Sequence, residues 1–563
     1  MAGMRVFGFG SGMDIDKMVS DLMKAERART VDKLEKEKQI TIWKQEMYQD
    51  INRDIAKFII DSRDKFDLSG KLITGGTYVK SYENMDWVKQ ATSSNESVLT
   101  ASATAKALDG SYKINITQLA KGVSKNSTVD ISVDGMDEHD KLYDQFLDLS
   151  SNDILSFTIT TTDENGNEKT QSFTFDLDKG TSDTSDDYTL DDIITEINNS
   201  DLDITVSYDS NFDRVFINST STGANVSLKI VDESSISSAN ADHFFSDILK
   251  INIDDASGTK VGGQDLKFTL GEGSDVTTLT YNSNTFSING INITANGTGE
   301  STITVKTDVD GVYEKIKEFV ESYNKLIDSI DAKLSEKVYR DYKPLTDEER
   351  KALTEDQIKK WEEMAKSGLL KNDSILEKVL YDARKALYEI VQNIGGTFKH
   401  LTDIGIDTGT YSEKGKLFID EAKLKQAISN DANGVMELLF KESDSSDEET
   451  KYNESGLITR LFDSMTDNMK KIIEKAGPGN DSSLLKQVKS NILVDFTIGS
   501  SYRSGSISFL QEDILDITKE IYKEEDRLKD LEDMYYKKFT AMETALAQMN
   551  NQSNWLASQL GGM

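Results

Sequence analysis

The chain has 563 residues, and its 65 basic and 99 acidic side chains give a formal net charge of −34 at pH 7. This length predicts several domains, and so acidic a surface repels nucleic acids and anionic lipids, so no nucleic-acid partner is expected. Cysteine is absent, which excludes disulfides and thiolate chemistry. No apolar run approaches the ~20 residues that span a bilayer, so no membrane insertion is expected, and residues 1–20 lack the apolar core of a cleavable signal peptide.

The N-terminal region reads as a long helix behind a glycine-rich leader. Three glycines alternate near the start: Gly8, Gly10 and Gly12. They are not interpreted as a phosphate loop, because no strand precedes them. Ser11 and Asp14 have capping-box spacing. Apolar residues at helical spacing, without proline, predict helix from Met13 to about Phe66. The first residues expected on one apolar face are Ile15, Val19 and Leu22.

The C-terminal region carries an apolar heptad repeat. Its main positions are Ile514, Ile521, Leu528, Tyr535, Met542 and Met549. Its companion positions are Ile517, Leu531, Phe539 and Leu546. Five consecutive heptads predict a coiled coil or a long bundle helix, since an ordinary amphipathic helix would drift off this repeat. A helix of ~50 residues is ~75 Å long and needs neighbours to bury its stripe. If the two terminal helices pack antiparallel, both termini lie at one end of a stalk.

The middle of the chain, from about Tyr78 to Val305, is rich in β-branched and small polar residues. The segment TFSINGINIT (285–294) predicts a hairpin with a type I′ turn at Asn289-Gly290. Residues 189–230 read as a short helix followed by strands, and helix resumes at 311–330. The predicted fold class is therefore α+β and multidomain, with antiparallel β-rich domains inserted between long coiled-coil-like terminal helices and a helical bundle.

No constellation of catalytic or metal-binding residues emerges from the sequence. The three histidines, His139, His243 and His400, are scattered. A calcium-loop interpretation of residues 306–317 fails, because lysines occupy its first and twelfth positions, where carboxylates are needed. We expect no enzyme activity, no cofactor and no metal site.

Several segments of the chain resemble the bacterial flagellar filament cap family, hook-associated protein 2. At the N-terminal end these segments are GSGMDIDKMVSDLMKAERA, WKQEMYQDIN and YKINITQLA. At the C-terminal end they are TITVKTDVDGVYEKIKEFVESYNKLID, DIGIDTGTYSEKGKLFIDEAKLKQAI and YYKKFTAMETALAQMNNQSNWLASQL. The segment TLDDIITEIN with VFINSTSTG is similar to a repeat shared with flagellins. The resemblance covers both ends of the chain in the family's order.

The resemblance implies a secreted structural cap at the distal tip of the flagellar filament, which promotes insertion of exported flagellin. It implies a homo-oligomeric ring with β-rich heads and helical legs. The implied partners are flagellin, the hook–filament junction proteins, and the flagellar type III export apparatus with its chaperone. We expect the leg helices to be incompletely buried and mobile in the isolated molecule, and to order against flagellin or neighbouring cap subunits.

The expected domain division has five parts. These are an N-terminal leg helix (1–45), a discontinuous helical core (46–80 and 310–505), a β-rich head domain (81–120 and 245–309), a second β-rich head domain with the flagellin-type repeat (121–244), and a C-terminal heptad leg helix (506–563). Three alternatives stay open from the sequence: an adhesin acting through exposed head domains, another hook-associated axial protein, and an enzyme carried in the head.

Overall fold

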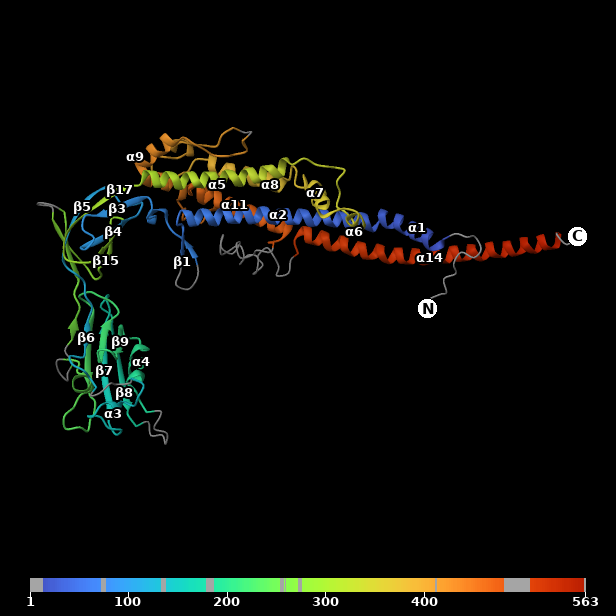
Figure 1. The fold of residues 1–563 in the computed structure, drawn as a ribbon. Coiled ribbons are helices and arrows are strands. Elements are labelled where there is room, and N and C mark those ends of the chain that lie inside the picture. Colours follow the sequence, from blue (N-terminus) through green and yellow to red (C-terminus); the bar gives the residue numbers. More distant parts are fainter. Residues whose placement is uncertain are drawn as a thin grey trace. The chain divides into compact units, whose positions relative to one another are not determined.

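The computed structural model describes residues 14–71, 77–132, 138–178, 187–253, 258, 260–271, 276–410, 413–479 and 507–560. The chain divides into two compact units. The helical unit comprises Met1–Met85 and Val309–Met563, and the β unit comprises Asp86–Asp308. Long helices dominate the first unit and antiparallel strands the second (Figure 1). This organisation confirms the predicted fold class.

The helical unit contains every long helix described. Its helices are α1 (Ile15–Arg29), α2 (Val31–Lys65), α5 (Val309–Ser335), α6 (Asp347–Lys351), α7 (Glu355–Lys366), α8 (Ser374–Tyr388), α9 (Glu421–Phe440), α10 (Glu448–Glu454), α11 (Leu457–Ala476) and α14 (Phe509–Leu560). Its short elements are β1 (Ser69–Lys71), β2 (Thr77–Val79), η1 (Tyr82–Asn84), η4 (Leu401–Ile404), β18 (Ile406–Asp407) and β19 (Phe418–Ile419).

An aromatic cluster holds α2 against helices from the second half of the chain. The ring of Phe58 on α2 lies 5.6 Å from that of Phe319 on α5 and 6.2 Å from that of Phe462 on α11. The ring of Phe66, just beyond α2, lies 4.7 Å from that of Phe440 on α9. Each such buried ring contributes about 1.5–3 kcal/mol. The N-terminal helix is therefore an integral part of the core built by residues 309–476.

The helix predicted from Met13 to Phe66 is interrupted at Thr30. This residue has φ −117° and ψ −80°, and its hydroxyl donates to the carbonyl oxygen of Glu26 at 3.0 Å. Such back-bonding by threonine bends helices, so the prediction of one uninterrupted helix was wrong here. Asp14 caps α1 by accepting from the backbone N–H of Lys17 at 2.9 Å. Ser11 and the three leader glycines lie outside the described residues.

In its described ranges, the β unit contains three sheets and a few short helical segments. Its strands are β3 (Lys89–Ser93), β4 (Leu99–Ala103), β5 (Gly110–Gln118), β6 (Ser124–Asn126), β7 (Ile154–Thr162), β8 (Glu168–Asp176), β9 (Ile204–Asp209), β10 (Arg214–Ser219), β11 (Ser227–Asp232), β12 (Val261–Gly262), β13 (Leu266–Leu270), β14 (Thr277–Tyr281), β15 (Thr285–Ile288), β16 (Ile291–Ala295) and β17 (Gly299–Thr307). Its helical segments are α3 (Leu142–Gln145), α4 (Leu190–Asn198) and η3 (Phe244–Ile248).

The largest sheet has the strand order β14-β13-β5-β17-β3-β4-β16-β15. The predicted hairpin forms its β15–β16 end, with Ile288 paired to Ile291. Asn289 and Gly290 have φ values of 49° and 80°, as a type I′ turn requires. A Cβ atom on Gly290 would lie 2.8 Å from the backbone nitrogen of Ala107, so the turn also requires the missing side chain. The hairpin prediction is confirmed.

Two smaller sheets, ordered β12-β11-β7-β8 and β6-β10-β9, share a separate core with α4. Phenylalanine rings fill much of it, with Phe157 within 6.1 Å of Phe173, Phe175, Phe244 and Phe245. A capping box between Thr189 and Asp192 starts α4. The predicted sequence of short helix and then strands is confirmed for this stretch, whereas the five-part domain division stays a prediction.

Candidate assembly surface

The two terminal helical segments pack antiparallel within the helical unit. The side-chain amide of Gln45 on α2 donates to that of Gln511 on α14 at 3.3 Å, whereas Arg27 on α1 lies 3.7 Å from Glu525 on α14. Higher residue numbers on α14 therefore lie opposite lower residue numbers on α2 and α1, which is the antiparallel arrangement. Figure 1 shows α14 continuing past the start of α1. At 52 residues, α14 is ~78 Å long.

The first half of the heptad ribbon is covered by this chain itself. Ile521 and Leu528 are 8% and 6% exposed, and they cluster with fully buried Val31 at the start of α2. The partly buried residues packed on this cluster are Met23, Leu34, Ile517 and Leu531. Ile514, one heptad earlier, is also buried. The expected incomplete burial of this leg helix therefore does not apply to Ile514, Ile521 and Leu528, the first three main positions of the ribbon.

Past Leu528 the main heptad positions of α14 become more exposed. Tyr535 and Phe539 are half-buried, but Met542 and Met549 are 36% and 64% exposed. In the same stretch Glu543 is buried, and the companion position Leu546 and its neighbour Ala547 are half-buried. An α-helix has 3.6 residues per turn, so a straight helix rotates away from a strict seven-residue repeat. The ribbon thus emerges on the surface in its last two heptads.

The apolar face of α1 follows a spacing of four. Ile15 and Val19 are 8% and 1% exposed, and Met23 continues the row into the cluster with Leu528. Leu22, expected on this face, is 38% exposed. Positions three and four residues apart both lie near a helical stripe, and the sequence did not decide between Leu22 and Met23. The structure selects Met23.

A network of ion pairs surrounds the seam between α1, α2 and α14. The guanidinium of Arg27 lies 2.9 Å from Glu35 and 3.7 Å from Glu525. In the opposite direction, Arg527 on α14 lies 4.0 Å from Glu26 on α1. The two arginines are 44% and 47% exposed, so each pair contributes at most about 1 kcal/mol. The network mainly fixes the register of the helices. The role of Arg27 was not predicted from the sequence. Arg27 on α1 contacts both α2 and α14, and this depends on the break between α1 and α2 at Thr30.

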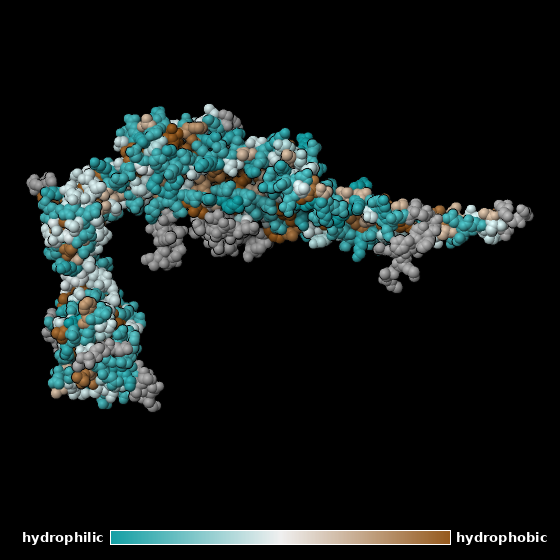
Figure 2. Space-filling model, viewed as in Figure 1, coloured by the Kyte–Doolittle hydropathy of each residue, from teal (hydrophilic) through white to brown (hydrophobic). Residues whose placement is uncertain are grey.

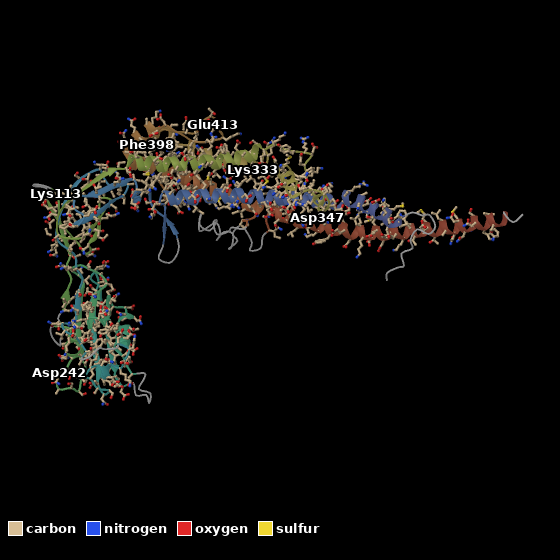
Figure 3. The ribbon with its side chains drawn as sticks, in the orientation of Figure 1. Lys113, Asp242, Lys333, Asp347, Phe398 and Glu413 are labelled. Atoms are coloured by element: carbon tan, nitrogen blue, oxygen red, sulfur yellow. The ribbon has the colours of Figure 1, made fainter. Side chains whose placement is uncertain are left out.

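Burial also perturbs one acid in this network. It raises the pKa of Glu35 above the ordinary value, and it outweighs the opposing attraction of Arg27. The next residue, Lys36, pairs with Glu349 on α6 at 2.8 Å. Figure 3 marks this place by Asp347, the first residue of α6. Short helices from the middle of the chain thus brace α2 beside the seam.

An open groove of about 590 Å³ follows the line where α1 meets α14. Its floor includes Met23 and Leu528, and its rim carries charges of both signs, including Lys24, Lys529 and Glu532. Figure 2 shows a largely hydrophilic surface along the described helices, with apolar residues in small patches. The groove is a surface feature between two helices, suited to contact with another side chain.

The described residues hold no cluster of candidate metal ligands. Within them, no three His, Cys, Asp or Glu side chains gather in a way that could hold a metal ion. His139 is largely exposed, 3.8 Å from Asp191, while His243 and His400 precede short helical segments. In the same ranges, no helix combines the length and apolar character needed to cross a membrane. Long antiparallel helices and a β insertion define a structural protein that works by assembly.

Comparison with known proteins agrees with this class. Residues 263–551 match the family model described as Flagellar hook-associated protein 2 C-terminus, and residues 11–122 match the corresponding N-terminus model. The chain is 30% identical over 575 residues to "Flagellar hook-associated protein 2" of Halalkalibacterium halodurans, covering 98% of both chains. The chain therefore belongs to the flagellar hook-associated protein 2 family.

Other relatives are more distant. The protein of the same name from Thermotoga maritima is 27% identical over 66% of this chain and 52% of its own length. Among solved structures, the D1-D2-D3 domains of the flagellar cap protein FliD from Escherichia coli share 18% identity. That match covers 75% of this chain and 96% of the other, with a TM-score of 0.46.

Family membership identifies the protein's role. It is a filament cap, located at the extracellular tip of the bacterial flagellum, and it promotes flagellin polymerisation there. It is a structural protein of motility and not an enzyme. The two alternatives of an enzyme carried in the head and of a different axial protein are thereby set aside.

Proposed function

We propose that the cap acts through the distal part of α14, which docks on flagellin and on neighbouring copies of this chain. The observation that carries the proposal is the exposure of large apolar side chains there: Met549 is 64%, Trp555 62% and Leu556 52% exposed. An exposed apolar row on a long helix is typical of a surface that packs against a partner helix.

The composition of this stretch supports the same proposal. Residues 544–560 contain no Asp, Glu, Lys or Arg, although charged residues make up 29% of the chain. A chain of net charge −34 repels acidic partners, and a charge-free contact surface avoids that cost. The side chains of Ile514, Ile521 and Leu528 hold the first half of α14 in place, so the distal part works as an arm on a fixed base.

Cap function requires contacts that break as each flagellin subunit inserts. We infer that the arm's contacts are individually weak, since each involves a few exposed side chains on one helix. The ring of identical subunits, the hook–filament junction proteins, and the type III export apparatus with its chaperone complete the proposed partners. Support for these last partners comes from family membership alone.

The experiment is a truncation after Lys529, which keeps Ile514, Ile521 and Leu528 but removes the arm. In a strain that lacks the chromosomal copy, we expect a folded protein, flagellin monomers in the medium and no filaments. Tyr522→Ala, an exposed position on the held half of α14, is the matched control and should support normal swimming. Full motility with the truncated protein would refute the arm as the acting part.

A further inference from the structure

The groove between α1 and α14 has walls with the spacing of two helical stripes. Its lining residues on α1 follow an i, i+3, i+4, i+7 pattern: Ser20, Met23, Lys24 and Arg27. Those on α14 extend the same pattern by one more turn: Glu525, Leu528, Lys529, Glu532 and Tyr536. The longer wall measures about 16 Å along the helix. A groove between two packed helices, lined in this way, has the shape that receives a third helix.

The helix α2 does not close this groove. All the residues that line the groove belong to α1 and α14, because α2 begins only at Val31, after the break at Thr30. Nearer its start, α14 is covered by α2 as well, through the cluster of Ile521 with Val31. The floor formed by Met23 and Leu528 is therefore covered on one side and open on the other.

The distal arm of α14 carries the matching stripe. Met542, Met549 and Leu556 lie seven residues apart and are 36%, 64% and 52% exposed, and Trp555 lies beside the last of them. These positions continue the repeat in which Leu528 already packs in a seam between helices. The distance from Met549 to Leu556 along the helix is about 10 Å, so both side chains fit within the length of the groove.

The polar chemistry of the arm also matches the rim. The rim carries both signs, and its Arg27 and Glu525 already lie 3.7 Å apart, so a charged helix would bring like charges together on one side or the other. Residues 544–560 carry no charge. Their side-chain amides each offer a donor and an acceptor, so they can bond to cations and anions alike: Gln548, Asn551, Gln552 and Asn554.

The chain cannot place its own arm in its own groove. Met549 lies about 32 Å beyond Leu528 on one continuous helix, α14. We propose that the arm of one copy lies in the α1–α14 groove of a second copy of this chain. This rests on the proposed function, which makes the arm the docking element, and it adds the surface that receives the arm. Because arm and groove are different surfaces, the contact is head-to-tail, and such contacts can close into a ring.

The test is cross-linking between two full-length variants, which is specific because the chain has no cysteine. One variant carries Ser20→Cys, and the other carries Met549→Cys and a size tag, so that the three possible products separate on a gel. With a short bismaleimide linker, we expect the mixed product at a yield about tenfold above that of a control pair, Ala25→Cys with Met549→Cys. Ala25 is an exposed residue of α1 outside the groove, and Ser20 and Met549 are also exposed, so the substitutions should leave the fold intact.

Two results would overturn the inference. One is an equal yield of mixed product from the Ala25→Cys pair. The other is a product made only of two Met549→Cys copies, which would show that arm packs on arm. If the groove product is missing while truncation after Lys529 still abolishes filaments, the arm docks elsewhere, and only this inference fails. If the groove product forms but the truncated protein supports full motility, the groove contact stands and the proposed function fails.

Discussion

At the scale of single residues, burial separates the side chains of α14 that hold the molecule together from those available to partners. Leu528 is 6% exposed and contacts the cluster around Val31, whereas Tyr522 on the same helix is 64% exposed. The heptad pattern alone treats Leu528 and Met549 as equivalent positions. The structure distinguishes them, because only the first has α1 and α2 opposite it.

Leu528→Ala should therefore destabilise the helical unit. Truncating a buried leucine leaves a cavity, and at this seam between α1, α2 and α14 we expect a loss of about 2 kcal/mol in the free energy of unfolding. Urea unfolding of the full chain, followed by far-ultraviolet circular dichroism, measures the change. Tyr522→Ala should shift the free energy by less than about 0.5 kcal/mol. Equal effects of the two substitutions would contradict the assignment of Leu528 to the seam.

A buried carboxylate in the β unit makes its stability depend on pH. Asp153 is 1% exposed. It accepts from the backbone N–H of Ser237 at 2.9 Å and that of Ser150 at 2.8 Å. Burial raises the pKa of Asp153, but the hydrogen bonds from Ser237 and Ser150 outweigh burial and hold the pKa below the usual value. Its stabilisation is therefore complete above the unfolded-state pKa of about 3.9 and is lost as pH falls through the lower folded-state pKa.

Asp153→Asn should remove this part of the acid sensitivity. Calorimetry of the full chain between about pH 5 and pH 2 should give a shallower fall in the melting temperature of the β unit for the variant than for the parent protein. The variant should also melt lower at neutral pH, because an amide cannot accept all the bonds that the carboxylate accepts. Parallel pH profiles would show that Asp153 is not the group responsible.

At the scale of elements, the sequence predicted which segments are helical better than it predicted where they bend or what covers them. The apolar periodicity of α14 correctly predicted one long helix, since this signal is local. The break at Thr30 depends on one hydroxyl and on Val31 turning into the seam, and neither is visible in the periodicity. The hairpin at Asn289-Gly290 was predictable, because two adjacent residues that favour positive φ are enough to specify a type I′ turn.

The division of α14 into a held half and an exposed arm was not predictable from the heptads. The helices α1 and α2 cover α14 only as far as their length and register allow, and Arg27 helps to set that register. Likewise, Leu22 and Met23 compete for one face of α1, and tertiary packing chooses Met23. The burial of Glu543 had no signal in the apolar periodicity of α14.

Met549→Glu tests the arm as an element. Met549 is 64% exposed, so a charge there should change the free energy of unfolding by less than about 0.5 kcal/mol. When this part of α14 contacts a partner, the carboxylate introduced at position 549 would be buried without a cation. Such burial weakens the association strongly. We expect a stable protein that fails to support filament growth in a swimming assay. Normal swimming would exclude Met549 from the contact surface.

At the scale of the whole molecule, charge opposes the assembly of identical copies. Each chain carries a net charge of −34, so copies that gather in the proposed ring would repel one another. Sedimentation velocity should therefore show more oligomer as salt rises from about 0.01 M to about 0.3 M, because the screening length falls from about 30 Å to under 10 Å. Dissociation on adding salt would instead indicate that attraction between opposite charges drives any association of the copies.

The central claim is that α14 has a first half held by its own chain and a distal end that presents apolar residues to partners. Hydrogen exchange along α14 in the isolated, dilute protein tests this most directly. We predict strong protection over residues 509–531, as in α2, and near-unprotected exchange over residues 548–560. Uniform protection as far as residue 560, equal to that of the core helices, would contradict the account.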